Sequence, residues 1–190
     1  MTKYFKTENV IVRKFNMKDV EQVHLNLPII ESNSLEETKI IVKSAINEYY
    51  TDEPTWAIED KQKKNLVGVI RVTNYCLKNK MCNITWMMSN KYWDNNFMKD
   101  ALTQIFNFLF SKKEIELIEC SFYEQNKNAS VILDGIGMTK EAVLRDRRIN
   151  EVTHEKENFV IYSINKHEFF QFKRENLNNH KFYNYLKRKI

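Results

Sequence analysis

The chain has 190 residues, of which 43% are hydrophobic and 29% are charged, so it has the length of one domain and enough apolar side chains for a sizeable core. No apolar run approaches the roughly 20 residues of a membrane-spanning helix, and the first residues lack the apolar core of a secretion signal, so we expect a cytoplasmic protein without a membrane partner. The net charge of +5 suits a polyanionic ligand, but outside segment 181–189 Lys and Arg are interspersed with Asp and Glu, which does not indicate nucleic-acid binding.

Apolar periodicity predicts alternating strands and helices along the chain. Strands are expected at 8–15, 56–58, 66–73, 81–88, 115–122, 138–149 and 158–164. Helices are expected after Asn16, which could cap the first one, and at 35–50, 97–110 and 126–136. A meander of strands followed by strand–helix–strand units predicts an α/β chain of the α+β type with a mixed sheet.

The composition changes near residue 166, after which the chain is polar, basic and rich in aromatic residues. We therefore expect residues 1–166 to form the folded domain. Residues 167–190 are expected to form a basic, aromatic C-terminal extension packed on or next to it, with a helix near 181–186. Its aromatic side chains could cover the core or a partner, so a monomer and a homodimer are both compatible with the sequence.

Cysteine and histidine residues show no metal-ligand spacing. The three cysteines, Cys76, Cys82 and Cys120, are an odd number, and the four histidines are scattered along the chain. We therefore expect reduced cysteines that serve as packing residues, and no metal ion.

The segment from Tyr92 to Ala101 lies between an expected strand and an expected helix that begins near Phe97. The first N–H groups of a helix have no partners within the helix, and the helix dipole favours negative charge there. A strand, a tight loop and a helix N-terminus in this order predict a site for a phosphate or another anion.

Several local segments follow one another in the order and spacing of a known pattern. They are Thr7–Arg13, 56–58 with 66–70, Asn83–Met88, Tyr92-Trp93, Asp100-Ala101, Ile118–Asn126, Asp134–Met138, Val143–Asp146 and Val160–Ile164. Together they cover residues 7–168 and resemble the GNAT acetyltransferases, in particular the ribosomal-protein N-terminal acetyltransferase branch. The resemblance implies a GNAT fold, with a mixed, mostly antiparallel seven-stranded sheet flanked by about four helices.

The resemblance also implies an activity and its ligands. Acetyl-CoA would donate an acetyl group to a primary amine, which could be a protein N-terminus, an amino acid or a small metabolite, by direct attack of the amine on the thioester. Backbone groups after the fourth strand would contact the carbonyl and the pantetheine, and the following loop would hold the pyrophosphate. The cofactor-binding residues implied in this way are Met87, Met88, Ser89, Trp93, Asp94, Asn95, Asn96, Phe97, Met98, Asn126 and Ala129.

The loop departs from the family pattern at three positions. Asp94 and Asn96 replace two glycines, and Met98 replaces a small residue. Asn96 could adopt a left-handed conformation at modest cost. Asp94 would repel a phosphate by roughly 3 kcal/mol at about 6 Å and an effective dielectric of about 20, unless it points outward, pairs with a lysine or caps the helix.

The catalytic positions differ as well. Asn83 replaces a glutamate that often relays the proton of the amine, and Ala129 replaces a serine that protonates the thiolate, which leaves Ser130 and Tyr123 as candidates. Arg145 could bind an acceptor carboxylate or be a surface residue. The alternative to an N-acetyltransferase is therefore a catalytically impaired binding or regulatory protein with the same fold.

Overall fold

The computed structural model describes residues 4–27, 34–93, 96–150 and 153–187, with 178–187 described by their backbone alone. The chain divides into two units, residues 1–121 and 122–190. Each unit is described by itself below.

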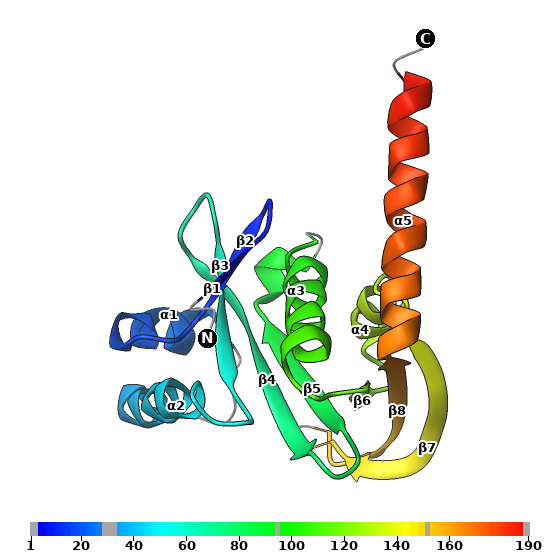
Figure 1. The fold of residues 1–190 in the computed structure, drawn as a ribbon. Helices are drawn as coiled ribbons and strands as arrows, with labels where there is room; N and C mark the ends of the chain where they lie inside the picture. The colour runs from blue at the N-terminus through cyan, green and yellow to red at the C-terminus, as the bar shows by residue number, and fades with distance from the viewer. Residues whose placement is uncertain (1–3, 28–33, 94–95, 151–152, 188–190) are drawn as a thin grey trace. The chain divides into compact units, whose positions relative to one another are not determined.

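The first unit contains most of the sheet (Figure 1). Its strands are β1 (Tyr4–Lys6), β2 (Val10–Arg13), β3 (Thr55–Asp60), β4 (Leu66–Cys76), β5 (Met81–Met88) and β6 (Leu117–Tyr123), the last of which ends in the second unit. The strands lie in the order of their numbers; the pairs from β1 to β5 are antiparallel, and β5 and β6 are parallel. The helices are α1 (Val20–Asn26), α2 (Leu35–Glu48) and α3 (Phe97–Lys112), with short 3-10 turns at Met17–Asp19 and Asn90–Tyr92.

Two capping residues begin the first helical segments, and the first of them, Asn16, is predicted by the sequence. The Asn16 side chain accepts a hydrogen bond from the N–H of Lys18, and the Asp19 carboxylate accepts one from the N–H of Asn16, which forms a capping box. The Ser34 side chain accepts from the N–H of Glu37 at the start of α2. These caps fix where the chain turns from strand or loop into helix.

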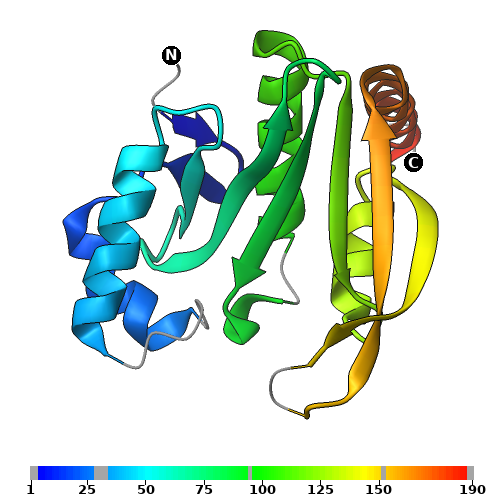
Figure 2. The same ribbon diagram turned by 90° about the horizontal axis from the view of Figure 1, so that it is seen from below.

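Helices cover both faces of the sheet in the first unit. Figure 2 shows α1 and α2 on one face and α3 on the other. Successive residues of a strand point to opposite faces of the sheet. Ala57 of β3 lies on the face that packs in the α1–α2 core, whereas Gly68 of β4 lies on the face toward Met98 of α3. The α1–α2 core comprises Phe15, Val20, Val23, Leu27, Val42, Ala45, Ala57 and Leu66.

The second unit contains α4 (Lys127–Asp134), β7 (Thr139–Ile149), β8 (Lys156–Asn165) and α5 (Lys166–Lys187). Strands β7 and β8 pair antiparallel with two register shifts. Gly137, at φ 91°, ends the turn between α4 and β7, and a Cβ atom there would lie 2.5 Å from Phe172 Cγ. Phe172 therefore packs directly on this turn, and α5 is held against the unit at its N-terminal end.

The predicted mixed, mostly antiparallel α/β fold is confirmed, with two additions. The described residues form eight strands and five α-helices, where the sequence predicted seven strands and about four helices. Strand β1 was missed because Thr7 makes a tight turn, in which its hydroxyl accepts from the N–H groups of Asn9 and Val10. Helix α5 includes the predicted segment 181–186 but begins at Lys166, where Asn165 and Glu168 form a reciprocal capping box.

Candidate active site

Strand β5 changes its pairing halfway along its length. Its register with β6 runs from Met81–Leu117 to Ile84–Cys120, whereas its register with β4 continues to Met88, opposite Gly68. Among the residues that the structure describes, the second half of β5 therefore pairs on one side only. We name this free side, from Thr85 to Met88, the open edge of β5.

The alternation of an antiparallel ladder decides which backbone groups face the open edge. The N–H of Ser89 donates to the carbonyl of Val67 at 2.9 Å, so Ser89 and, two residues earlier, Met87 direct their backbone groups to β4. Met88 and Trp86 then direct theirs to the open edge. The indole Nε1 of Trp93 donates to the carbonyl of Met88 at 3.2 Å, which leaves the N–H of Met88 as a donor at this edge.

Helix α3 begins a few residues after the open edge of β5. Its N-cap is Asn96, whose side chain makes no capping hydrogen bond, and the first helical bond runs from the N–H of Asp100 to the carbonyl of Asn96 at 2.8 Å. The N–H groups of Phe97, Met98 and Lys99 therefore have no acceptors within the helix. They can bind an anion, which the helix dipole also favours.

Asn96 does not adopt the left-handed conformation that the sequence left open to it. Its φ is −72°, because a helix N-cap needs no positive φ. Asp94 and Asn95 lie outside the described residues. The Met98 side chain is fully buried, and its Cε lies 2.9 Å from the position that a Cβ atom on Gly68 would take. Phe97 packs on Tyr92, with ring centroids 5.8 Å apart. Both residues can offer a bound anion their backbone N–H groups.

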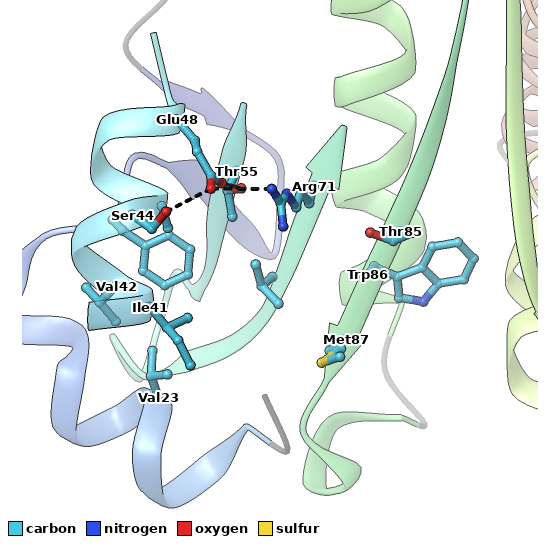
Figure 3. Close-up of a pocket in the computed structure, with 13 residues that line it drawn as sticks. Val23, Ile41, Val42, Ser44, Glu48, Thr55, Arg71, Thr85, Trp86 and Met87 are labelled. Atoms are coloured by element: carbon cyan, nitrogen blue, oxygen red, sulfur yellow. Dashed lines mark hydrogen bonds and ion pairs between the residues drawn. The ribbon is translucent and has the colours of Figure 1, made fainter. Parts of the chain in front are cut away.

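A cavity of about 280 Å³ lies between α2 and the strands of the first unit, and we name it the α2 cavity (Figure 3). Its apolar part is formed by Phe15, Val23, Ile41, Val42, Ala45, Val69 and Met87, and its polar part by Ser44, Glu48, Thr55, Arg71 and Thr85; Trp86 also lines it. Figure 3 shows the ring of Trp86 pointing away from Glu48 and Arg71. One wall of the α2 cavity is thus the second half of β5.

The strand register separates the polar and apolar parts. Thr55, Arg71 and Thr85 lie opposite one another on β3, β4 and β5. Two residues along, Val69 lies opposite Met87, and the same face of the sheet is apolar there. Polar residues therefore form one row across the cavity wall, and apolar residues form another.

Glu48 organises the polar part of the α2 cavity. One of its carboxylate oxygens, Oε1, accepts from Ser44 Oγ at 2.9 Å and lies 3.3 Å from Arg71 Nη2. The other, Oε2, accepts from Thr55 Oγ1 at 2.8 Å. Three donors from α2, β3 and β4 thus hold the carboxylate in one orientation (Figure 3).

The predicted catalytic residues lie in different units. Asn83 is half-buried on β5, opposite Thr73, and is not part of the wall of the α2 cavity. Tyr123, at the end of β6, is half-buried and packs edge-on against Phe159 at 5.4 Å. Ser130 is half-buried on α4. Their roles stay predictions.

The two remaining predicted cofactor residues lie at the start of α4. The Asn126 side chain is the helix cap and accepts from the N–H of Ala129 at 3.2 Å. Ala129 itself is 2% exposed. These positions can offer backbone groups to a ligand, while the amide oxygen of Asn126 already has a partner.

Sequence reasoning missed the polar residues Glu48, Arg71 and Thr85. Glu48 lies at the end of an amphipathic helix, where a charged residue is usual. Arg71 interrupts an apolar strand, where a single charged residue indicates an exposed position. The signal that could have found them is the alternation along β4 and β5, which places Arg71 and Thr85 on the same face as Val69 and Met87.

Three further observations concern the cysteines, possible metal ligands and membrane-spanning helices. Burial raises the pKa of Cys82 to about 12 and that of Cys120 well above the ordinary value of a thiol, so both are inert packing residues. Within the described ranges, no group of three or more His, Cys, Asp or Glu side chains could hold a metal ion. The helices described by the structure include none that is long and apolar enough to cross a membrane.

Comparisons with known proteins show the family and the fold of this chain. Residues 9–139 match the model of the acetyltransferase (GNAT) domain. The uncharacterized N-acetyltransferase YoaA of Bacillus subtilis is 26% identical over 58% of this chain and 62% of its own length, so the match spans less than two thirds of that relative.

Solved structures share the fold at low identity. A structure described as a putative ribosomal-protein-serine acetyltransferase from Vibrio cholerae is 16% identical, with a TM-score of 0.71 over 87% of this chain and 99% of the other. The microcin C7 self-immunity acetyltransferase MccE, in complex with acetyl-CoA and AMP, is 14% identical, with a TM-score of 0.76 over 87% and 97%. Together with the domain match, which covers more than half of the chain, this shows that the protein belongs to the GNAT acetyltransferase family.

Proposed function

We propose that this protein is an N-acetyltransferase that moves an acetyl group from acetyl-CoA to a primary amine by direct attack. The observation that carries the proposal is the open edge of β5. It presents the Met88 N–H, while the same half of the strand forms a wall of the α2 cavity. One strand thus offers a donor for a carbonyl and a space for an amine.

The residues of the first unit suit acetyl-CoA. The unpaired N–H groups at the start of α3 would hold the pyrophosphate, and the open edge of β5 would run beside the pantetheine. The Met88 N–H would polarise the thioester carbonyl, since such a donor stabilises the charge that develops on the oxygen. The choice of acetyl-CoA as the donor is supported by MccE, which shares the fold and is in complex with acetyl-CoA.

The reaction needs few side chains. The neutral amine attacks the carbonyl carbon, a C–N bond forms, and the C–S bond breaks to release the thiolate of CoA. The ammonium proton leaves through water, for which Asn83 can accept or donate a hydrogen bond, and Tyr123 or Ser130 supplies a proton to the thiolate. Holding both reactants together supplies much of the rate enhancement, which a backbone-built site can provide.

The first test is calorimetric titration of the full chain with acetyl-CoA, using a matched pair of variants at the first position of α3. Proline is tolerated there but lacks the N–H group, whereas alanine keeps it. Both Phe97→Pro and Phe97→Ala lose the contact with Tyr92. We expect about tenfold weaker binding of acetyl-CoA to Phe97→Pro than to Phe97→Ala, because one charge-assisted hydrogen bond is lost.

The second step is a screen of amines for acetyl-CoA-dependent release of free thiol. Micromolar binding and turnover with at least one amine are the expected results. Tight binding without turnover on any amine would favour the alternative of a catalytically impaired binding protein. Failure to bind acetyl-CoA at millimolar concentration would refute the proposed function.

A further inference from the structure

We infer that the acceptor is a small amine that also carries a carboxylate, of the class of apolar amino acids, and that Arg71 binds this carboxylate. The inference deepens the proposed function and rests on it, because an acceptor subsite presupposes acetyl transfer. It concerns the polar part of the α2 cavity, whose wall includes residues of β5, the strand that also carries the open edge.

The guanidinium group of Arg71 has N–H donors beyond the one that contacts Glu48. A guanidinium group carries five N–H donors in a planar fork, which fits a carboxylate in a bidentate manner. The described part of the chain engages only Nη2, which lies 3.3 Å from Glu48 Oε1. The side chain of Arg71 is 46% exposed, and it lines the α2 cavity. The remaining N–H groups can therefore reach an anion in the cavity.

Glu48 does not compete for these donors. Its two oxygens already accept from Ser44, Thr55 and Arg71, so the carboxylate has little capacity left for a cationic ligand. By fixing Nη2, Glu48 limits the rotation of the guanidinium and keeps the rest of the fork oriented. A polyamine, which would need free carboxylates, fits this arrangement poorly.

The neighbouring side chains define the rest of the acceptor. Thr85 lies opposite Arg71 on β5 and adds a hydroxyl to the polar row. Two residues along β5, about 7 Å at 3.4 Å per residue, Met87 begins the apolar part, which continues to Val23 and Val42. An amine with a carboxylate and an apolar side chain matches both parts.

The size of the α2 cavity agrees with a small acceptor. Its volume of about 280 Å³ lies just below the range of roughly 300–1,000 Å³ that is typical of ligand pockets. A protein N-terminus has no carboxylate at the required position, since its carbonyl continues into a peptide bond. Of the acceptors considered for the fold, the free amino acid therefore fits best.

The test measures binding of two reaction products that differ only in charge. N-acetyl-L-leucine and its uncharged amide, N-acetyl-L-leucinamide, are titrated into the purified full chain by calorimetry, which requires no catalysis. We expect the acid to bind about tenfold more tightly than the amide, since hydrogen bonds to charged groups are the stronger ones. Arg71→Gln should abolish this preference, and Arg71→Lys should keep part of it, because lysine retains the charge without the fork.

Lys43→Gln is the matched control, because it removes the same charge from an exposed position of α2 outside the cavity wall. It should keep the full preference for the acid. Equal binding of acid and amide, a preference that survives in Arg71→Gln with an unchanged unfolding temperature, or no binding of either product at 10 mM, a concentration about a hundredfold above a typical sub-millimolar KM, would overturn the inference. If the preference depends on Arg71 but no amine is acetylated, the proposed function fails while the carboxylate subsite stands.

Discussion

The open edge of β5 and the α2 cavity share one strand but are built from different parts of the chain. The open edge and the start of α3 offer backbone N–H groups, which every residue except proline supplies. The polar part of the α2 cavity depends on the side chains of Glu48, Arg71 and Thr85. A backbone-built site can keep its ligand when side chains change, whereas a side-chain-built site changes its ligand with them.

This difference bears on Asn96, the one described residue that stands in the place of a loop glycine. The sequence left a left-handed conformation open to Asn96, which stands in the place of a glycine, yet its φ of −72° is ordinary for any residue. The close backbone approach instead occurs at Gly68, where a Cβ would lie 2.7 Å from the carbonyl oxygen of Met87 and 2.9 Å from Met98 Cε. The glycine that matters for the open edge is therefore on β4.

The largest effect is expected for Gly68→Ala, which tests the backbone-built site. The added methyl group would push the carbonyl of Met87 and move the second half of β5, because backbone atoms cannot step aside as a flexible side chain can. We expect kcat/KM for the best acceptor to fall about 100-fold, since a displacement of about 1 Å has such an effect, and the free energy of unfolding to fall by about 2 kcal/mol.

Gly135→Ala is the control for this change, because Gly135 has φ −67° at the end of α4, a conformation open to alanine. Steady-state kinetics and urea unfolding would be compared for the two variants. Activity of Gly68→Ala within threefold of the control would show that the open edge does not set the rate.

The next largest effect is expected for Ala45→Leu, which fills the apolar part of the α2 cavity. Ala45 is 7% exposed and lines the cavity from α2. The longer side chain would compete with the acceptor for space. We expect the KM of the acceptor to rise at least about tenfold, because leucine adds three carbon atoms and the space of a single methylene is already worth about 1–3 kcal/mol. The Kd of acetyl-CoA, measured by calorimetry, should stay the same.

A rise in the Kd of acetyl-CoA as large as the rise in the KM of the acceptor would contradict the separation of the open edge of β5 from the α2 cavity. Leucine favours helix, so α2 itself should not be weakened. Thermal unfolding of Ala45→Leu would show whether the core around Val42 accepts the added volume.

The sequence predicted the fold better than the cavity, and the reason lies in register. The strands and α3 follow from periodicity within each segment, and β5 was predicted with its observed bounds, Met81–Met88. The row of Thr55, Arg71 and Thr85 depends on how three strands slide against one another. Register shifts between Ile58 and Glu59 and between Thr73 and Cys76 set that alignment, and bulges of this kind have no reliable sequence signal.

A smaller effect is expected for Thr85→Val, which removes one hydroxyl from the polar row and keeps the shape of the side chain. We expect N-acetyl-L-leucine to bind about threefold more weakly, at the low end of the value of one hydrogen bond, because Thr85 is exposed to solvent. Thr73→Val, on the neighbouring strand opposite Asn83 and outside the cavity wall, is the control and should bind normally. Equal loss in both variants would point to a change in the sheet rather than in the cavity.

The smallest effect is expected for the thiols, which report on the paired half of β5. Cys82 and Cys120 are buried where β5 and β6 still pair, whereas Cys76 is partly exposed. Burial raises the pKa of Cys82 to about 12, so at pH 8 only Cys76 should react with iodoacetamide in the folded chain, as mass spectrometry of the peptides would show. Because the raised pKa favours the protonated thiol in the folded state, its contribution is complete below the unfolded value of 9.0 and is lost as the pH rises toward 12. The free energy of unfolding should therefore decline above about pH 9, by at most about 1.4 kcal/mol per thiol and pH unit. Reaction of Cys120 at pH 8 would mean that the opening of β5 extends past Ile84 into the paired half.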